Sequence, residues 1–108
     1  MKVLLGVHSR QRKPIVHVVE DDLWNLDHTL SEIILCCLRK FKEKTYSYPN
    51  EFANHPDPMK AWKEALDKMI CSFEYVQSNT WPRMTKADYK KFGEGMKLFS
   101  KFYSSLWI

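Results

Sequence analysis

The chain has 108 residues, of which 44% are hydrophobic and 14% aromatic, and its formal net charge is +4 at pH 7. This length suits one domain with a single core and is too short for two, and the apolar content excludes a disordered tail. The longest apolar runs, such as "IILCCL", are far shorter than the roughly 20 residues of a membrane span, and no signal peptide opens the chain, so we expect a soluble intracellular protein.

The first 19 residues predict a β-hairpin. Two short aliphatic runs, "KVLLGV" and "IVHVV", are separated by the polar stretch "HSRQRKP". Pro14 stands at the start of the second run, where its missing N–H is tolerated. A lone hairpin is marginally stable in water, so we expect this one to pack on the segments that follow.

A first helix is expected over residues 25–44, with Asn25 or Asp22 as its N-cap. Spacings of three and four predict one buried face, made of Leu23, Asp27, Leu30, Ile34, Cys37 and Phe41. Asp27 is the one carboxylate in this row, and an unpaired buried charge is very costly. Asp27 therefore either points into a partly polar cavity or forms a structural hydrogen bond to a Tyr, Trp or Lys of another helix.

Two further helices are expected over residues 58–77 and 86–106. Asp57 and Pro58 are typical of a helix start, as are Thr85 and Asp88. The buried face of the second is predicted to be Met59, Trp62, Leu66, Met69, Phe73 and Val76, and that of the third Tyr89, Phe92, Met96, Phe99, Tyr103 and Leu106.

Two glycines inside the third helix, Gly93 and Gly95, each cost roughly 1 kcal/mol relative to alanine. Their presence indicates that another helix or a ligand approaches the backbone there. Taken together, the elements predict one mainly α domain (α+β by strict naming) over residues 1–108, with an N-terminal β-hairpin packed on a three-helix bundle.

The sequence favours neither a metal site nor nucleophilic catalysis. Cys36, Cys37 and Cys71 are odd in number and have no CxxC spacing, so we expect reduced core thiols. The histidines have no ligand spacing, and no serine or cysteine stands in a nucleophile motif. We therefore expect no cofactor and no enzyme activity.

A binding site is predicted around the start of the first helix. Trp24, Asp27, His28 and Ser31 lie at offsets that share one helix face, which brings together an indole, a carboxylate, an imidazole and a hydroxyl. The indole can stack on a base, the carboxylate can accept from ribose hydroxyls, and the imidazole can donate to a phosphate or sugar.

Four further residues are candidates for the same site. Arg10, Arg12 and Lys13 of the basic run "RQRK" could contact phosphates, although a basic loop beside the acidic "EDD" at residues 20–22 is equally typical of a solvated surface. Lys101 could face the pocket, and Tyr48, in a loop of about a dozen residues, could form its lip.

The chain resembles a family of small proteins of tailed bacteriophages. The resemblance rests on "RKPIVHVVEDDLWNLDHTLSEIIL", "WKEALDKMICSFEY" and "GMKLFSKFYSSLW", which cover most of the chain from about residue 12 onward. It implies expression in the host bacterial cytoplasm and a role in the takeover of the host, without naming an activity.

Four functions follow from these observations. The first is a phage counter-defence protein that sequesters a small nucleotide immune signal, of ADP-ribose or cyclic-dinucleotide type as in Thoeris or CBASS systems, without catalysis. The alternative is a protein that inhibits a host enzyme or defence protein by direct binding. The third is an enzyme that cleaves such a signal, with His28 and Asp27 as acid and base. The fourth is a nucleic-acid binder, which ranks lowest of these because +4 is modest and the acidic turn opposes phosphates. A homodimer or higher homo-oligomer would supply a second wall to a pocket.

Overall fold

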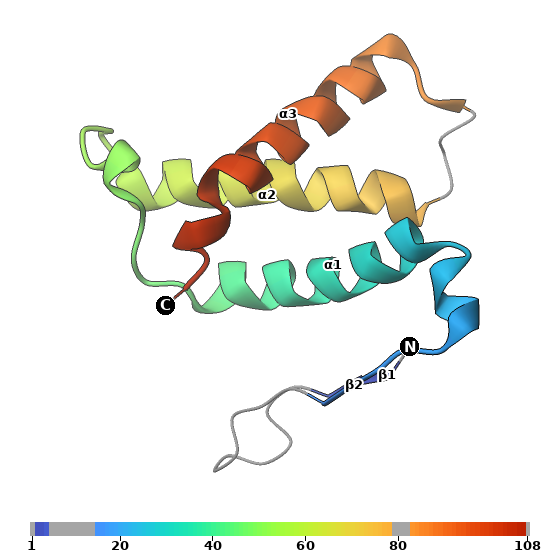
Figure 1. Cartoon of the computed structure of the whole chain (residues 1–108). Coiled ribbons are helices and arrows are strands. Elements are labelled where there is room, and N and C mark those ends of the chain that lie inside the picture. The colour runs from blue at the N-terminus through green and yellow to red at the C-terminus, as the bar shows by residue number, and fades with distance from the viewer. Residues whose placement is uncertain (1, 5–14, 79–82, 108) are drawn as a thin grey trace.

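A computed structural model describes residues 2–4, 15–78 and 83–107 of the chain. Three helices make up most of it: α1 spans Leu26–Lys44, α2 spans Pro58–Gln77 and α3 spans Lys86–Phe102. Figure 1 shows α2 between α1 and α3, in a molecule whose principal extents are 47 × 45 × 18 Å. The predicted mainly helical class is confirmed. None of the helices in the described ranges is both long and apolar enough to cross a membrane.

The helices begin where the capping residues predict. The Asp57 carboxylate accepts a hydrogen bond from the Lys60 N–H at 3.2 Å, and Pro58 is the first residue of α2. At the start of α3, the Thr85 hydroxyl accepts from the Asp88 N–H at 3.2 Å while the Asp88 carboxylate accepts from the Thr85 N–H at 3.0 Å. α3 ends four residues before the predicted residue 106 and is followed by a 3₁₀ turn at Tyr103–Ser105.

The core lies along α2. The residues predicted to form its buried face are buried, except Met59, which is half-buried and packs against the core. Trp62 is only 1% exposed, and its ring lies 5.7 Å from Phe52 and 5.4 Å from Phe102. Phe52 belongs to a 3₁₀ turn, Asn50–Phe52, in the long loop after α1, so that loop covers one end of the core with an aromatic ring.

The close approach predicted at the two glycines of α3 is confirmed at Gly95 and wrong at Gly93. A Cβ on Gly95 would overlap the side chain of Ser72 and the backbone oxygen of Lys68, both in α2. A Cβ on Gly93 would meet no atom within 4 Å. The Ser72 hydroxyl donates to the backbone oxygen of Phe92 at 2.8 Å, which joins the two helices at this point.

The predicted buried face of α3 is correct at Met96, Phe99 and Leu106, which pack against the core, and wrong at its two tyrosines. Tyr89 and Tyr103 are exposed, whereas Gly95 and Phe102 are buried. Apolar spacing alone predicts that the two tyrosines are buried. It gives no sign that Gly95, which has no side chain, forms the close contact with α2.

The predicted buried face of α1 is also rotated. Ser31, Leu35 and Leu38 are its buried residues, whereas Asp27, Leu30 and Cys37 are exposed. Asp27 therefore does not occupy a core position, and among the described residues no polar cavity is found around it. It lies in the first turn of α1, where a negative charge interacts favourably with the helix dipole.

Two short strands precede the helices. Strands β1, Lys2–Leu4, and β2, Ile15–His17, pair antiparallel with Val3 opposite Val16, but the segment between them lies outside the described residues. Figure 1 shows the pair extending away from the helices, and the Val16 side chain is 55% exposed. The predicted packing of a hairpin on the bundle is therefore not confirmed.

The three thiols are free, as expected, but two of them are not in the core. Cys36 and Cys37 are exposed, and Cys71 is intermediate. Both exposed thiols lie on sides of α1 that point away from the core.

Candidate functional site

The residues predicted to bind a ligand divide into an exposed and a packed group. Trp24 is 81% exposed, and Asp27 is exposed as well. Ser31 is buried between α1 and α2, and His28 is half-buried. The four lie near one another along the chain, but they do not line one enclosed pocket in the described structure.

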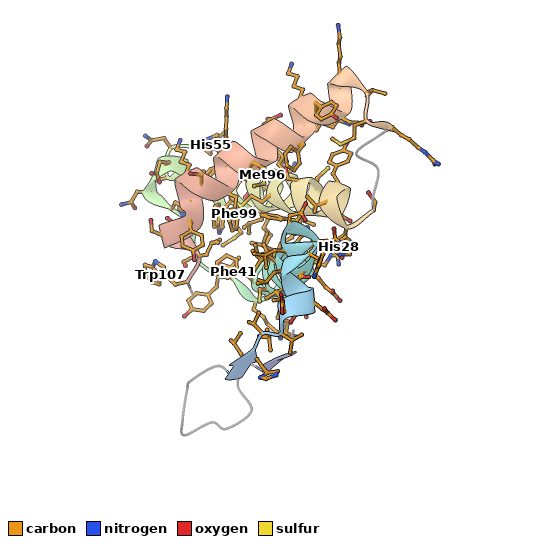
Figure 2. All side chains as sticks on the ribbon, turned by 45° about the vertical axis from the view of Figure 1, so that its right-hand side comes forward. His28, Phe41, His55, Met96, Phe99 and Trp107 are labelled. Carbon is orange, nitrogen blue, oxygen red and sulfur yellow. The ribbon has the colours of Figure 1, made fainter. Side chains whose placement is uncertain are left out.

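His28 is held by the end of α2. Its Nε2 lies 3.3 Å from the backbone oxygen of Gln77, and the side-chain amide of Gln77 donates to the backbone oxygen of His28. Figure 2 shows His28 near the start of α1. This pair of contacts ties the first turn of α1 to the last turn of α2, which gives His28 a structural role.

The remaining candidates lie elsewhere. Tyr48 follows the C-terminal end of α1, about 28 Å of helix away from Trp24. It lines a hollow of about 440 Å³ together with Ser105 and Trp107. Lys101 is exposed near the end of α3, with its ammonium 5.1 Å from the centre of the Phe102 ring. Arg10, Arg12 and Lys13 lie outside the described residues.

A larger groove, of about 810 Å³, follows the seam between α1 and α2. Its walls carry side chains of both charges, among them Glu32, Lys40 and Glu43. An ion pair between Arg39 and Glu74 crosses the seam at 3.2 Å, and both side chains are about half exposed. The opposing charges compensate one another, so the groove has no clear preference for an anionic ligand.

The most unusual feature of the molecule is an exposed apolar surface at its N-terminal side. We call it the N-terminal surface. It consists of side chains from β2, from the 3₁₀ turn Glu20–Leu23 and from the start of α1, namely Val16, Val18, Val19, Leu23, Trp24, Leu26 and Leu30. Apolar patches of this kind on soluble proteins mark interaction sites.

The carboxylates of this part of the chain have no lysine or arginine among them. Glu20, Asp21, Asp22, Asp27 and Glu32 fall in this part of the chain, and the sequence has no lysine or arginine between Lys13 and Arg39. The surface therefore combines apolar side chains with an acidic border.

Sequence reasoning missed this surface because it assigned one apolar face to α1. The helix carries two. Besides the buried face, Leu26, Leu30, Ile33 and Cys37 repeat at spacings of four and three along the opposite side. The presence of two apolar rows on one helix indicates, from the sequence alone, that one row faces away from the core.

Two shifted pKa values belong to the junction of α2 and α3. The Thr85 backbone N–H and the phenol of Tyr75 lower the pKa of Asp88. The same phenol donates to Asp88 at 3.0 Å, which raises the pKa of Tyr75 to about 12. These groups stabilise the helix start and are not placed for proton transfer in the α1–α2 groove.

Within the described ranges, no group of three or more His, Cys, Asp or Glu side chains is placed to hold a metal ion. No protein-family model, curated protein or solved structure matches the chain.

Proposed function

We propose that the protein acts without catalysis, by binding another protein through the N-terminal surface. The observation that carries this proposal is the exposure of Trp24, which is 81%, at the centre of a chain segment whose neighbouring apolar side chains are also exposed. Tryptophan is enriched among the residues that dominate binding energy at protein interfaces. The resemblance to small bacteriophage proteins supports a host protein in the bacterial cytoplasm as the target.

The chemistry of the surface constrains its partner. A partner must cover Trp24, Leu26 and Leu30 with an apolar patch of its own, since burial of apolar area drives association. Around that patch it should carry lysine or arginine, because the border of the N-terminal surface is acidic and complementary charge increases specificity and the association rate.

Sequestration of a nucleotide has less support from the geometry. A protein that sequesters a nucleotide must enclose it. Trp24 and Asp27 are both exposed, however, and Tyr48 lies at the other end of α1. Sequestration by these residues stays a prediction. It would be favoured over protein binding by recovery of an intact nucleotide, released by heat from the protein and absent from an Asp27→Asn variant.

The test is capture of partners from host lysate after nuclease treatment, with three versions of the protein. Wild type is compared with Trp24→Ser and with Trp107→Ser, in which an equally large indole is removed at the opposite end of α1. Trp107 is the matched control because it is 69% exposed and lies outside the N-terminal surface. We expect a host protein, identified by mass spectrometry, to be retained by wild type and Trp107→Ser and lost by Trp24→Ser. Equal retention by all three would contradict the proposal.

A further inference from the structure

We propose that a second copy of this chain also binds the N-terminal surface, through the outward face of α3. This inference rests on the proposed function only in using the same surface as a docking site. If a second copy binds there, the protein self-associates in the absence of a host partner. A host partner must then displace the neighbouring copy from the N-terminal surface.

The outward face of α3 is basic. Four exposed lysines lie on one side of the helix, because their spacings of four, seven and four residues return to the same face: Lys86, Lys90, Lys97 and Lys101. We call this the α3 basic surface. None of the four forms an ion pair within 4 Å to any described residue. Glu94, on the same helix, pairs instead with Lys68 of α2 at 2.9 Å.

Positive and negative side chains are concentrated in different segments of the chain. Residues 83–108 hold six basic and two acidic side chains, so the net charge of this segment, +4, equals that of the whole chain. Residues 14–38 hold five acidic side chains and neither lysine nor arginine. The chain therefore contains both the acidic, apolar surface and a basic surface with the charge that its partner needs.

The α3 side also offers apolar contacts. Tyr89 is 51% exposed and lies three residues after Lys86, so the two side chains are neighbours on the helix. Tyr103 is exposed near the other end of the row. Exposed aromatic rings near the lysines suit a surface that presents Trp24 and leucines within an acidic border.

The two surfaces cannot meet within one molecule. Figures 1 and 2 show α3 on one side of α2, and α1 with the strand pair on the other. Contact between them therefore joins different copies, and we expect it to do so head to tail and not reciprocally within a two-fold dimer. Such a heterologous contact builds rings or open chains, because each copy keeps one surface free for the next.

Sedimentation analysis of two single-surface variants and their mixture tests this arrangement. Trp24→Ser with Leu30→Ser removes apolar contacts from the N-terminal surface, and Lys90→Glu with Lys97→Glu makes the α3 basic surface repel the acidic border. All four side chains are exposed, so circular dichroism should show the wild-type fold in both variants. The first variant retains the α3 basic surface, and the second retains the N-terminal surface.

We expect wild type to grow beyond a dimer with increasing concentration at low salt. Raising the salt from about 0.1 M to about 1 M shortens the Debye length from about 10 Å to about 3 Å and should weaken the association. Each variant alone should be monomeric, and an equimolar mixture should form a 1:1 pair that grows no further.

Monomeric wild type at low salt, or a mixture that stays monomeric, would overturn this inference. If the monomer still captured a host protein through Trp24, the proposed function would stand without it. If wild type self-associated as expected while Trp24→Ser still captured the host protein, the inference would stand and the proposed function would fail.

Discussion

Two tryptophans show how differently the two sides of this molecule are built. Trp62, in α2, is 1% exposed and packs against rings from the loop after α1 and from α3, whereas Trp24 is 81% exposed. The first indole holds three segments of the chain together. The second contributes almost nothing to burial, and under the proposed function it is the centre of the binding surface. The core of this molecule is therefore closed around Trp62, whereas Trp24 is left available for the contact we propose.

The largest effect on stability is expected from Trp62→Ala. Removing a buried tryptophan loses its transfer free energy and leaves a cavity, at a cost of about 3–5 kcal/mol in the free energy of unfolding. Urea denaturation followed by circular dichroism measures it. A cost below about 1 kcal/mol would mean that Trp62 is not the centre of the core.

Gly95→Ala should be the next most destabilising change, by about 2–3 kcal/mol, because its Cβ would overlap Ser72 and the backbone of α2. Gly93→Ala is the matched control two residues away. Its Cβ meets nothing within 4 Å, so the better helix propensity of alanine should stabilise the protein by about 0.5–1 kcal/mol. The same sign for both substitutions in thermal denaturation would contradict the close contact of α2 and α3 at Gly95.

A smaller effect is expected at the start of α3. Thr85→Ala removes the acceptor for the Asp88 N–H and should cost about 1 kcal/mol. The cap should also depend on pH. Because the folded-state pKa of Asp88 is lowered, its stabilisation is present above the ordinary aspartate pKa and is lost as pH falls through the folded value.

Asp88→Asn provides the control for this pH dependence. We expect the variant to be less stable than wild type at neutral pH and to approach it at acidic pH, in thermal denaturation at both. A difference that stays constant over this range would show that the charge of Asp88 does not contribute to the cap.

The smallest effect on stability is expected from Trp24→Ser. An exposed side chain away from caps and core contacts changes the free energy of unfolding by no more than about 0.5 kcal/mol. Denaturation of Trp24→Ser and Trp62→Ala under the same conditions therefore tests the contrast between the exposed and the buried tryptophan. A loss of several kcal/mol from Trp24→Ser would place Trp24 in the fold and not at a binding surface.

The sequence predicts what local chemistry determines. The starts of α2 and α3 follow from Asp57, Pro58 and the Thr85–Asp88 pair, and the buried face of α2 follows from uninterrupted apolar spacing. The face of α1 could not be chosen this way, because its apolar residues form two rows and only the position of α2 decides which is covered.

The candidate site was predicted only in part for the same reason. The sequence singled out Trp24 as a candidate binding residue, which stays a prediction. It placed Asp27 in a buried row with Leu23 and Leu30, whereas Asp27 is exposed. Exposure depends on where the neighbouring helix ends. Hydrogen bonds join the last turn of α2 to the first turn of α1 at Gln77 and His28, and Trp24 precedes that contact in the chain.

Amide hydrogen exchange by mass spectrometry, comparing the free protein with its isolated complex with a host protein, shows whether the N-terminal surface is the binding surface. We expect slower exchange over residues 20–30, which carry the 3₁₀ turn and the start of α1, and unchanged exchange in the middle of α2. Protection confined to the groove between α1 and α2, with residues 20–30 exchanging as in the free protein, would contradict the proposed function.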